Sequence, residues 1–184
     1  DMMIKIQFGD PSLDNHFFKK NLALLKDHIS WPEAIDTELS EKITILDAKS
    51  GQPTAQHKNI LLHSKYDPEK EGMDFAKNIP LGSRVCLYGF GLGYHLQPLL
   101  EKIGPDGFLI VIELNLDILT AALKVKDHTQ LFKNNRFKLI SGVNESTVSD
   151  EISREMQNIS KESSDKLEIL FHTPSFKCIP DNFP

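Results

Sequence analysis

Three glycines at alternate positions, Gly89, Gly91 and Gly93, are the residues of this chain whose type and spacing point most directly to chemistry. They follow an apolar run of strand length and precede apolar residues at helical spacing, and a second apolar run ends in the carboxylate of Glu113. This order is typical of a nucleotide site, in which glycines let a ligand approach the main chain and the acid accepts hydrogen bonds from ribose. The alternative interpretation is that the glycines only form a tight strand-to-helix turn.

The elements that must position these residues are strands alternating with helices. The apolar runs that predict strands cover residues 85–88, 108–112, 137–140 and 167–171. Such alternation predicts an α/β fold of Rossmann-like type, in which a mostly parallel sheet has helices on both faces. The carboxyl ends of parallel strands meet at one edge of the sheet. We therefore expect residues 89–93, 113–115, 141–144 and 172–175 to lie along that edge.

The N-terminal part of the chain has a different pattern, which predicts a small helical and antiparallel β segment. An amphipathic helix is expected over residues 15–29, and a short second helix is expected to start at residues 30–32, Ser-Trp-Pro. Residues 43–46 and 60–62 read as strands that form an antiparallel pair, with a short third strand between them in the sequence.

The expected domain organisation follows from these patterns. Residues 1–80 form the helical and β-hairpin segment, residues 81–176 form the Rossmann-like βαβ unit, and residues 177–184 link this unit to a downstream domain. A complete doubly wound sheet of the methyltransferase type needs about three more strands than the pattern provides. This shortfall favours a fragment of a longer protein over an abbreviated fold.

Composition excludes several classes of partner. The 184 residues are 40% apolar with a net charge of -5, which suits one compact domain and, without a cluster of Lys and Arg, predicts no binding to nucleic acid. No apolar run approaches the roughly 20 residues that span a bilayer, and no export signal opens the chain. We expect a cytoplasmic protein with no membrane partner. Cys86 and Cys178 have no spacing that predicts a disulfide framework or a metal site.

A few further polar residues are candidates for binding. His63, Lys65, Tyr66 and Asp67 cluster in the sequence and suit contact with an anionic sugar or phosphate. Tyr66 also suits packing, and Asp67 followed by Pro68 also suits the cap of a helix that starts there. His95 follows the glycines, and His172 follows the last predicted strand at the same edge of the sheet. No neighbouring nucleophile or orienting carboxylate accompanies His95 in the sequence, and His172 suits hydrogen bonding in a strand-to-loop turn. No catalytic residue is predicted.

The glycine-rich turn with its distal acid resembles class I S-adenosylmethionine-dependent methyltransferases and the related spermidine synthases, over about residues 84–171. This resemblance implies that Gly89, Gly91 and Gly93 pass close to the cofactor, that Glu113 binds its ribose and that Asn144 lies by its base. The chain departs from the methyltransferase pattern in two places. Leu87 stands where an acid is common, and His172-Thr173-Pro174-Ser175 replaces an Asp-Pro-Pro-Tyr type of catalytic run.

A second resemblance extends over nearly the whole chain. Leu62-His63-Ser64-Lys65-Tyr66-Asp67-Pro68-Glu69-Lys70-Glu71 and Tyr88-Gly89-Phe90-Gly91-Leu92-Gly93-Tyr94-His95 are similar to the N-terminal domain of the motility accessory factor (Maf) family of bacteria. Members of that family are implicated in glycosylating flagellin with nonulosonic acids, and their central domain resembles glycosyltransferases.

The Maf resemblance implies an accessory, non-catalytic domain whose partners are a downstream glycosyltransferase domain and, through the parent protein, flagellin. As a pure interaction domain it would present the transferase to flagellin or to another copy of itself, which allows a homo-oligomer. The alternatives are a methyltransferase or spermidine synthase-like enzyme, and a nucleotide or nucleotide-sugar binding module. The corresponding cofactors are S-adenosylmethionine or a nucleotide sugar.

Overall fold

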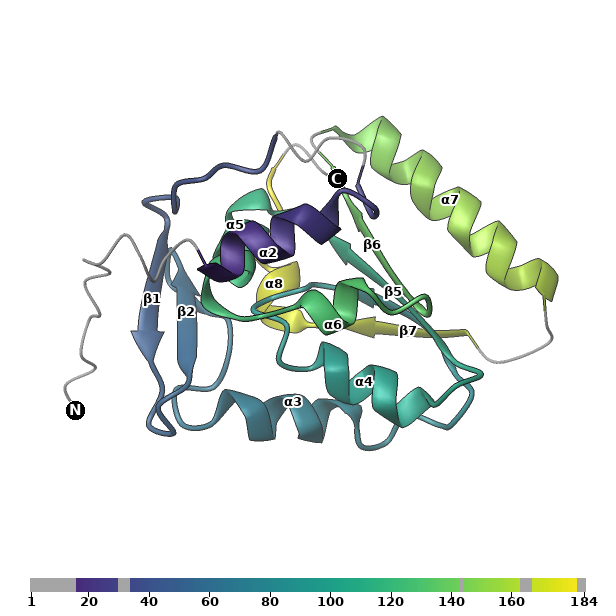
Figure 1. The fold of residues 1–184 in the computed structure, drawn as a ribbon, viewed down its shortest axis with the longest axis horizontal. Coiled ribbons are helices and arrows are strands. Elements are labelled where there is room, and N and C mark those ends of the chain that lie inside the picture. The colour runs from purple at the N-terminus through teal and green to yellow at the C-terminus, as the bar shows by residue number, and fades with distance from the viewer. Residues whose placement is uncertain (1–15, 30–33, 143, 163–166, 182–184) are drawn as a thin grey trace.

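The protein contains two β-sheets, one parallel and one antiparallel (Figure 1). The computed structural model describes residues 16–29, 34–142, 144–162 and 167–181, without the side chains of residue 145 and residues 159–162. The parallel sheet has four strands in the order β6-β5-β4-β7, and the antiparallel sheet has three in the order β1-β2-β3. The predicted α/β, Rossmann-like class with a preceding antiparallel segment is confirmed.

The parallel sheet and its helices account for the C-terminal part of the chain. Its strands are β4 (Arg84–Tyr88), β5 (Phe108–Glu113), β6 (Phe137–Ser141) and β7 (Leu167–Phe171). Its helices are α4 (Leu96–Ile103), α5 (Leu116–Val125), α6 (Thr129–Phe132), α7 (Glu145–Glu162) and the short α8 (Thr173–Phe176). The four predicted strands are all present. No helix among the described residues combines the length and apolar character needed to cross a membrane.

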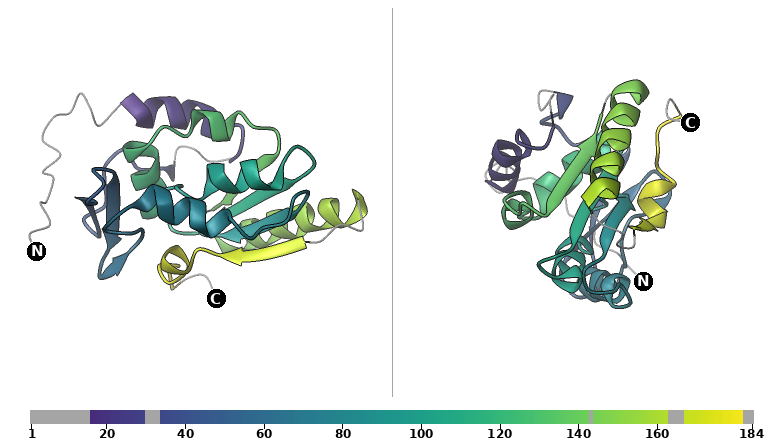
Figure 2. Two further views of the ribbon diagram at one scale, coloured as in Figure 1. Left: turned by 90° about the horizontal axis from the view of Figure 1, so that it is seen from below. Right: turned by 90° about the vertical axis from the view of Figure 1, so that its right-hand side faces the viewer.

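Helices cover the two faces of the parallel sheet unequally (Figure 2). Successive side chains of a strand point to opposite faces. Val85 and Leu87 of β4 therefore join the larger apolar cluster, with α4, α5 and α6, whereas Cys86 joins a smaller cluster with Val148 of α7. The long apolar runs of the sequence reflect this burial on both faces, which is usual for parallel strands.

The N-terminal segment adds α2 (His16–Leu25), β1 (Ile43–Asp47), β2 (Pro53–His57), β3 (Ile60–Leu61) and α3 (Pro68–Ala76). β2 pairs antiparallel with both β1 and β3, so the expected direct pairing of residues 43–46 with residues 60–62 is wrong. The reason is the tight turn at Gly51, whose φ of 85° returns the chain directly beside β1 and places β2 between the two expected partners. The helix expected at residues 30–32 lies outside the described residues.

Local chemistry explains where α3 begins and how it packs. The Asp67 side chain accepts a hydrogen bond from Lys70 N at 2.9 Å, and Pro68 occupies the first turn, where its missing N–H is not needed. At Gly72 a Cβ would overlap the carbonyl of Tyr94. The glycine thus lets α3 lie directly on the segment between β4 and α4, which carries the three alternating glycines.

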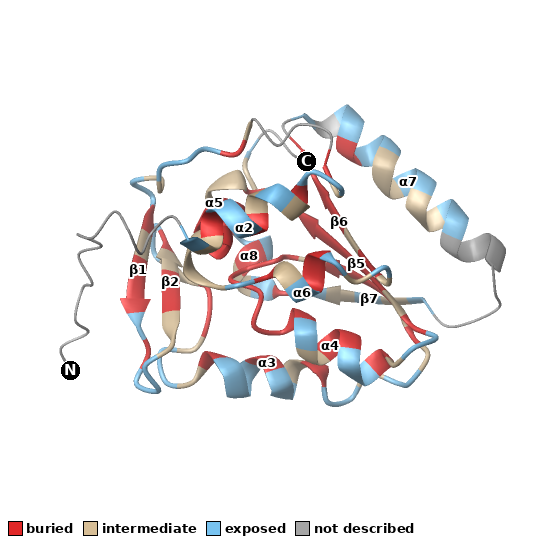
Figure 3. Cartoon of the chain, in the orientation of Figure 1, coloured by how far each residue is buried: buried red, intermediate tan, exposed pale blue. Residues whose placement is uncertain are grey.

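The N-terminal helix α2 carries both buried and exposed residues (Figure 3), and buried polar contacts join it to the Rossmann-like unit. The Asn21 amide of α2 donates hydrogen bonds to the carbonyls of Leu123 and Lys126, each at 2.8 Å, and accepts one from His128 N at 2.8 Å. Because the side chain is fully buried, these three bonds satisfy groups that water does not reach. α2 is therefore held against α5 by polar as well as apolar contacts.

Replacing Asn21 by alanine is expected to lower the free energy of unfolding by about 2–4 kcal/mol, because two carbonyls and one N–H lose their partner in the interior. The comparison is Gln97→Ala, which removes an exposed amide that donates only to Glu101 Oε1. Urea unfolding followed by circular dichroism measures both variants, and Gln97→Ala should stay within about 0.5 kcal/mol of the wild type. Similar losses in the two variants would contradict a structural role of Asn21.

Candidate functional site

The glycine-rich turn runs from the end of β4 to the start of α4. Gly89, Gly91 and Gly93 have φ values of 111°, 54° and 85°, in the left-handed region that favours glycine. Gly89 N also donates to the carbonyl of Ile112 at 2.8 Å, which extends the pairing of β4 with β5 by one residue. The alternate spacing of the glycines is thus a conformational requirement of the turn.

Side chains of this protein pack against the main chain of the turn. A Cβ on Gly91 would lie 2.6 Å from Nε2 of His63 and 2.9 Å from Cε1 of His172. A Cβ on Gly89 would lie 2.8 Å from Cβ of Ser175, in the short α8. The close approach that glycine permits is therefore made by imidazole rings and by the segment after β7.

Glu113 binds the same turn from the end of β5. Its side chain is 1% exposed, Oε2 accepts a hydrogen bond from Phe90 N at 2.9 Å, and Oε1 accepts one from Asn115 N at 3.0 Å. Burial raises the pKa of Glu113 to about 7, although hydrogen bonds from the main-chain N–H groups of Asn115, Phe90, Gly91 and Leu114 oppose this rise. The carboxyl group predicted to bind ribose holds main-chain donors of its own protein.

Three buried imidazoles stack over the turn. The rings of His95 and His172 are 4.5 Å apart with an angle of 10° between their planes, and those of His63 and His172 are 4.6 Å apart at 28°. His63 Nε2 accepts a hydrogen bond from Leu92 N at 2.9 Å. Its Nδ1 must then carry the proton, which it donates to Glu71 Oε1 at 2.9 Å. His63 thereby connects the N-terminal segment to the turn.

All three of these histidines are held in the neutral form. His95 donates from Nε2 to the carbonyl of Gly89 at 3.1 Å, and its buried Nδ1 has no hydrogen-bond partner among the described residues. Burial lowers the pKa of His95 to about 3, and burial together with the nearby imidazoles also places the pKa of His172 well below its usual value. Burial likewise lowers the pKa of His63 in spite of the opposing effect of Glu71.

Three histidines form a candidate metal site, because nitrogens of His63, His95 and His172 lie within 4.8 Å of one another. The stacking of the rings opposes this role. A metal lies in the plane of each imidazole that binds it, about 2.1 Å from the nitrogen, and two nearly parallel rings 4.5 Å apart cannot direct their lone pairs to one point. Both nitrogens of His63 are moreover engaged in hydrogen bonds. In this arrangement the cluster suits packing and hydrogen bonding.

The other predicted binding residues make local contacts. Asn144 is exposed, and its Oδ1 accepts a hydrogen bond from Thr147 N at 3.0 Å in the first turn of α7. Tyr66 is exposed with the amines of Lys49 and Lys65 over its ring, at 4.8 and 5.3 Å from the centroid. The structure thus brings Gly89, Gly91 and Glu113 together. Asn144 instead caps a helix, and its predicted contact with a base stays a prediction.

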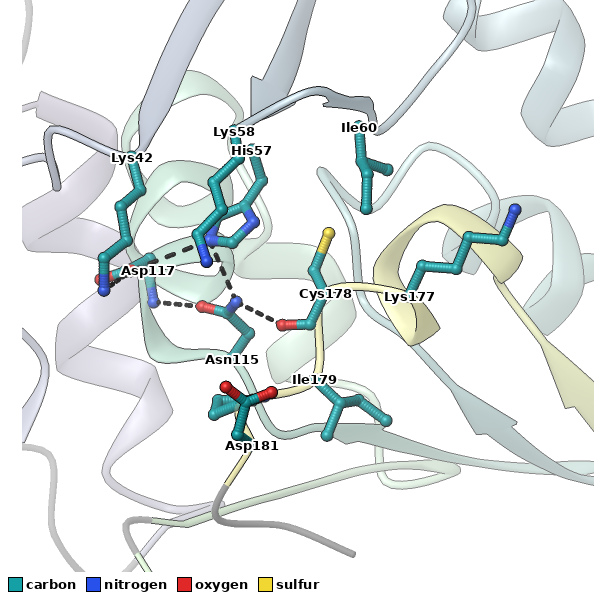
Figure 4. A pocket seen from close by; sticks show the side chains of 11 residues that line it. Lys42, His57, Lys58, Ile60, Asn115, Asp117, Lys177, Cys178, Ile179 and Asp181 are labelled. Carbon is teal, nitrogen blue, oxygen red and sulfur yellow. Dashed lines mark hydrogen bonds and ion pairs between the residues drawn. The ribbon is translucent and has the colours of Figure 1, made fainter.

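A cavity of about 290 Å³ lies beside Asn115, between the antiparallel sheet and the tail that follows α8 (Figure 4). Its polar lining combines Lys42, Lys58, Lys177, His57, Asn115, Asp117 and Asp181. The Asn115 amide donates to the carbonyl of Cys178 at 2.7 Å, and Lys42 lies 4.0 Å from Asp117. The mixed charges offer donors and acceptors to a small polar ligand. A second cavity, of about 340 Å³, lies beside Gly93 and is lined by residues 126–131.

Sequence reasoning missed the residues around this first cavity. His57 ends β2 and Lys58 follows it in the turn to β3, and the positive φ of 53° at Lys58 is not readable from its residue type. Asn115 carried a usable signal, because an asparagine directly before an apolar helical pattern is a typical N-cap. Its Oδ1 does accept hydrogen bonds from Asp117 N and Ile118 N.

Substitution at Gly91 separates backbone strain from packing. Gly82 has a φ of 79° and open space where the methyl group of an alanine would lie, whereas Gly91 combines a positive φ with two imidazoles. Gly82→Ala is expected to cost about 1 kcal/mol of unfolding free energy, and Gly91→Ala at least about 2 kcal/mol more, because the rings must move. Chemical denaturation measures both. Equal losses of unfolding free energy in the two variants would mean that the imidazole rings move aside at no energetic cost.

The buried histidines are expected to make the fold acid-sensitive. An unfolded histidine titrates near 6.5 and the folded His128 near 4, so below pH 6.5 the unfolded state binds more protons and stability falls. For His128 alone the loss approaches roughly 3 kcal/mol by pH 4. Glu113 acts oppositely, since its raised pKa adds stability as the pH falls from about 7 to 4.5. His95 and His128, with folded pKa values of about 3 and 4, together outweigh it.

Urea unfolding between pH 7.5 and 4.5 tests this expectation. The unfolding free energy should decrease as the pH is lowered. His128→Gln, although less stable at pH 7.5, should show a smaller decrease. His16→Gln, on the exposed side of α2, is the matched control and should keep the slope of the wild type. A flat profile in the wild-type protein would contradict the neutral state of the buried histidines.

Comparison with known proteins gives the context of this turn. Among solved structures, a Maf glycosyltransferase from Magnetospirillum magneticum AMB-1 aligns with a TM-score of 0.65 and 16% identity, over 86% of this chain and 32% of that one. A spermidine synthase from Thermotoga maritima aligns with a TM-score of 0.45 and 18% identity, over 60% of this chain and 41% of that one. Curated proteins give no match.

The chain spans about a third of the length of the Maf glycosyltransferase, and at 16% identity that likeness shows a shared fold. Residues 55–176 match the model of one family directly, and they include α3, the glycine-rich turn and all four parallel strands. The resemblance to Maf proteins that the sequence motifs indicate is therefore confirmed: the chain belongs to the family of glycosyltransferase Maf N-terminal domains.

Proposed function

We propose that this chain is an accessory, non-catalytic domain of a Maf-like glycosyltransferase that modifies flagellin in the bacterial cytoplasm. Family membership implies a parent protein with a further glycosyltransferase domain. In this role the domain supplies a rigid base for the transferase and carries no sugar-transfer residue of its own. Fold alone does not give function, so the proposal rests on the chemistry of the glycine-rich turn.

The observation that carries the proposal is that groups of this protein already occupy the Glu113 carboxyl group and the space beside the glycines. The carboxyl oxygens accept hydrogen bonds from Phe90 N and Asn115 N, and the space that a Cβ of Gly91 would need is taken by His63 and His172. A cofactor bound as in a methyltransferase would have to displace these groups, which are buried and packed together. The turn is better suited to hold the N-terminal segment against the sheet.

The competing function is a binding module for S-adenosylmethionine or a nucleotide sugar, in which Gly89, Gly91, Gly93, Glu113 and Asn144 contact the cofactor. The two functions make opposite predictions for one substitution. Under the accessory role Glu113→Ala damages the fold, and under the binding role it removes an acceptor for ribose and leaves the fold largely intact.

In the full-length parent protein, Glu113→Ala is expected to lower the unfolding free energy by about 2–4 kcal/mol, because buried N–H groups lose their acceptor. Flagellin modification, measured by mass spectrometry of flagellin peptides, should fall in proportion to the folded fraction and recover at a lower temperature. Glu101→Ala, in the exposed last turn of α4, is the matched control and should leave both quantities unchanged.

Calorimetric titration of the wild-type parent with S-adenosylmethionine, and separately with a nucleotide-activated nonulosonic acid, completes the test. The accessory role predicts that Glu113→Ala leaves any heat of binding unchanged once the protein is folded. A Glu113→Ala protein that melts like the wild type, yet loses modification or cofactor binding, would overturn the accessory role and establish the turn as a ligand site.

A further inference from the structure

The outer strand of the parallel sheet exposes apolar side chains. β7 lies at the edge of the sheet, and among the described residues it pairs with β4 alone. Leu167, Ile169 and Phe171 alternate along it and are all exposed, Ile169 at 53% and Phe171 at 46%. Phe176 of α8 is also exposed. We call these four residues the β7 surface.

The strand register shows which face of the sheet the β7 surface belongs to. Ile169 pairs with Cys86 and Phe171 pairs with Tyr88, and paired residues of neighbouring parallel strands point to the same side. Cys86 belongs to the small apolar cluster that includes Val148 of α7. The β7 surface therefore continues the face of the sheet that α7 covers.

Burial falls steadily across this face. One line of paired residues runs from Ile140 through Ile112 and Tyr88 to Phe171, and the exposed fraction rises along it from 0% and 1% to 46%. α7 packs over the β6 end of this line, away from β7 (Figure 1). One half of the face is thus the interior of the protein, and the other half is open.

Aromatic side chains give the open half a defined shape. The rings of Tyr88 and Phe171 stack with centroids 5.3 Å apart, and Phe176 meets Phe171 edge to face at 5.0 Å. Parallel sheets are normally covered on both faces, and contiguous exposed apolar side chains mark a contact surface. The β7 surface is therefore a preformed contact surface for an apolar partner.

We propose that, in the parent protein, an amphipathic helix from the polypeptide that follows this domain covers the β7 surface. The proposal rests on the part of the proposed function that gives the parent a further glycosyltransferase domain. The helix would complete the face that α7 begins, and it would join the two domains through a shared apolar core.

The connections of the sheet favour a helix of the same polypeptide. From β4 through β5 to β6 the chain moves toward one edge with its helices on one face, and from β6 to β7 it returns with α7 on the other face. Right-handed crossovers require this change of face. Residues 177–181 first run back to Asn115 at the start of α5. When the polypeptide after them adds a parallel strand beside β7, the same rule places the crossover helix on the face of α7. That position is the β7 surface.

Thiol labelling in the full-length parent tests whether the surface is covered. Ile169→Cys and Met73→Cys replace side chains of similar exposure in this domain, 53% and 57%, and Met73 lies on the solvent side of α3. The native Cys86 and Cys178 are buried and set the background. We expect Ile169→Cys to react with a maleimide at least tenfold more slowly than Met73→Cys, at every protein concentration.

Equal labelling rates would overturn the proposal, because the surface would then be open. Protection of Ile169→Cys that disappears on dilution would also overturn it, in favour of contact between two copies of the chain. Rapid labelling of Met73→Cys together with slow labelling of Cys86 shows within the same experiment that the domain is folded.

Photocrosslinking identifies the covering segment. Phe171→p-benzoylphenylalanine in the parent places a photoreactive ring at the centre of the surface, and peptide mass spectrometry maps its partner. A crosslink to a helical peptide beyond residue 184 supports the proposal. Crosslinks confined to residues 1–184, where Tyr88 and Phe176 already contact Phe171, or crosslinks to an isotopically labelled second copy overturn it. Neither measurement uses flagellin, so failure of the accessory role in flagellin modification is seen separately.

Discussion

The hydrogen bonds between the Glu113 carboxyl group and the main chain of the glycine-rich turn are the constraint on which the rest of the structure depends. They join the end of β5 to the turn after β4, and through Asn115 to the start of α5. Removing a carboxylate from water is costly unless donors replace the lost hydration. The turn supplies such donors only because its glycines adopt left-handed conformations. The sheet edge and the loop conformation therefore require each other.

The imidazole cluster extends this dependence to the N-terminal segment. His63 precedes α3, His95 precedes α4 and His172 follows β7, so three distant parts of the sequence meet at one point. Neutral imidazole both packs as a flat ring and forms hydrogen bonds, which suits the space against a bare main chain. The apolar cluster likewise includes Phe18 and Leu25 of α2 together with Leu87 of β4. The N-terminal helix and the sheet thus share one core.

Much of the fold was predictable because the relevant signals are local. Four apolar runs indicated the parallel strands, and Asp67 with Pro68 marked the start of α3 through its cap. The pairing of β1 with β2 was not predictable from apolar pattern, because β2 is the polar run Pro-Thr-Ala-Gln-His and its place is set by the turn at Gly51. The glycines and Glu113 were recognised as a unit. What they contact was hidden, because the partners His63 and His172 are distant in sequence and the resemblance supplied a ligand in their place.

The hydrogen bond from Asn115 to the carbonyl of Cys178 has a consequence for the assembly of the parent protein. It fixes the tail after α8 against the start of α5, so the chain approaches its exit from the domain at a defined point. A segment tethered by a few residues to such a point searches a volume of only a few nanometres, which corresponds to an effective concentration in the millimolar range. An interdomain contact that would be too weak between separate molecules can then be almost fully occupied. Anchoring the tail thus raises the occupancy of the interdomain contact without raising its intrinsic affinity.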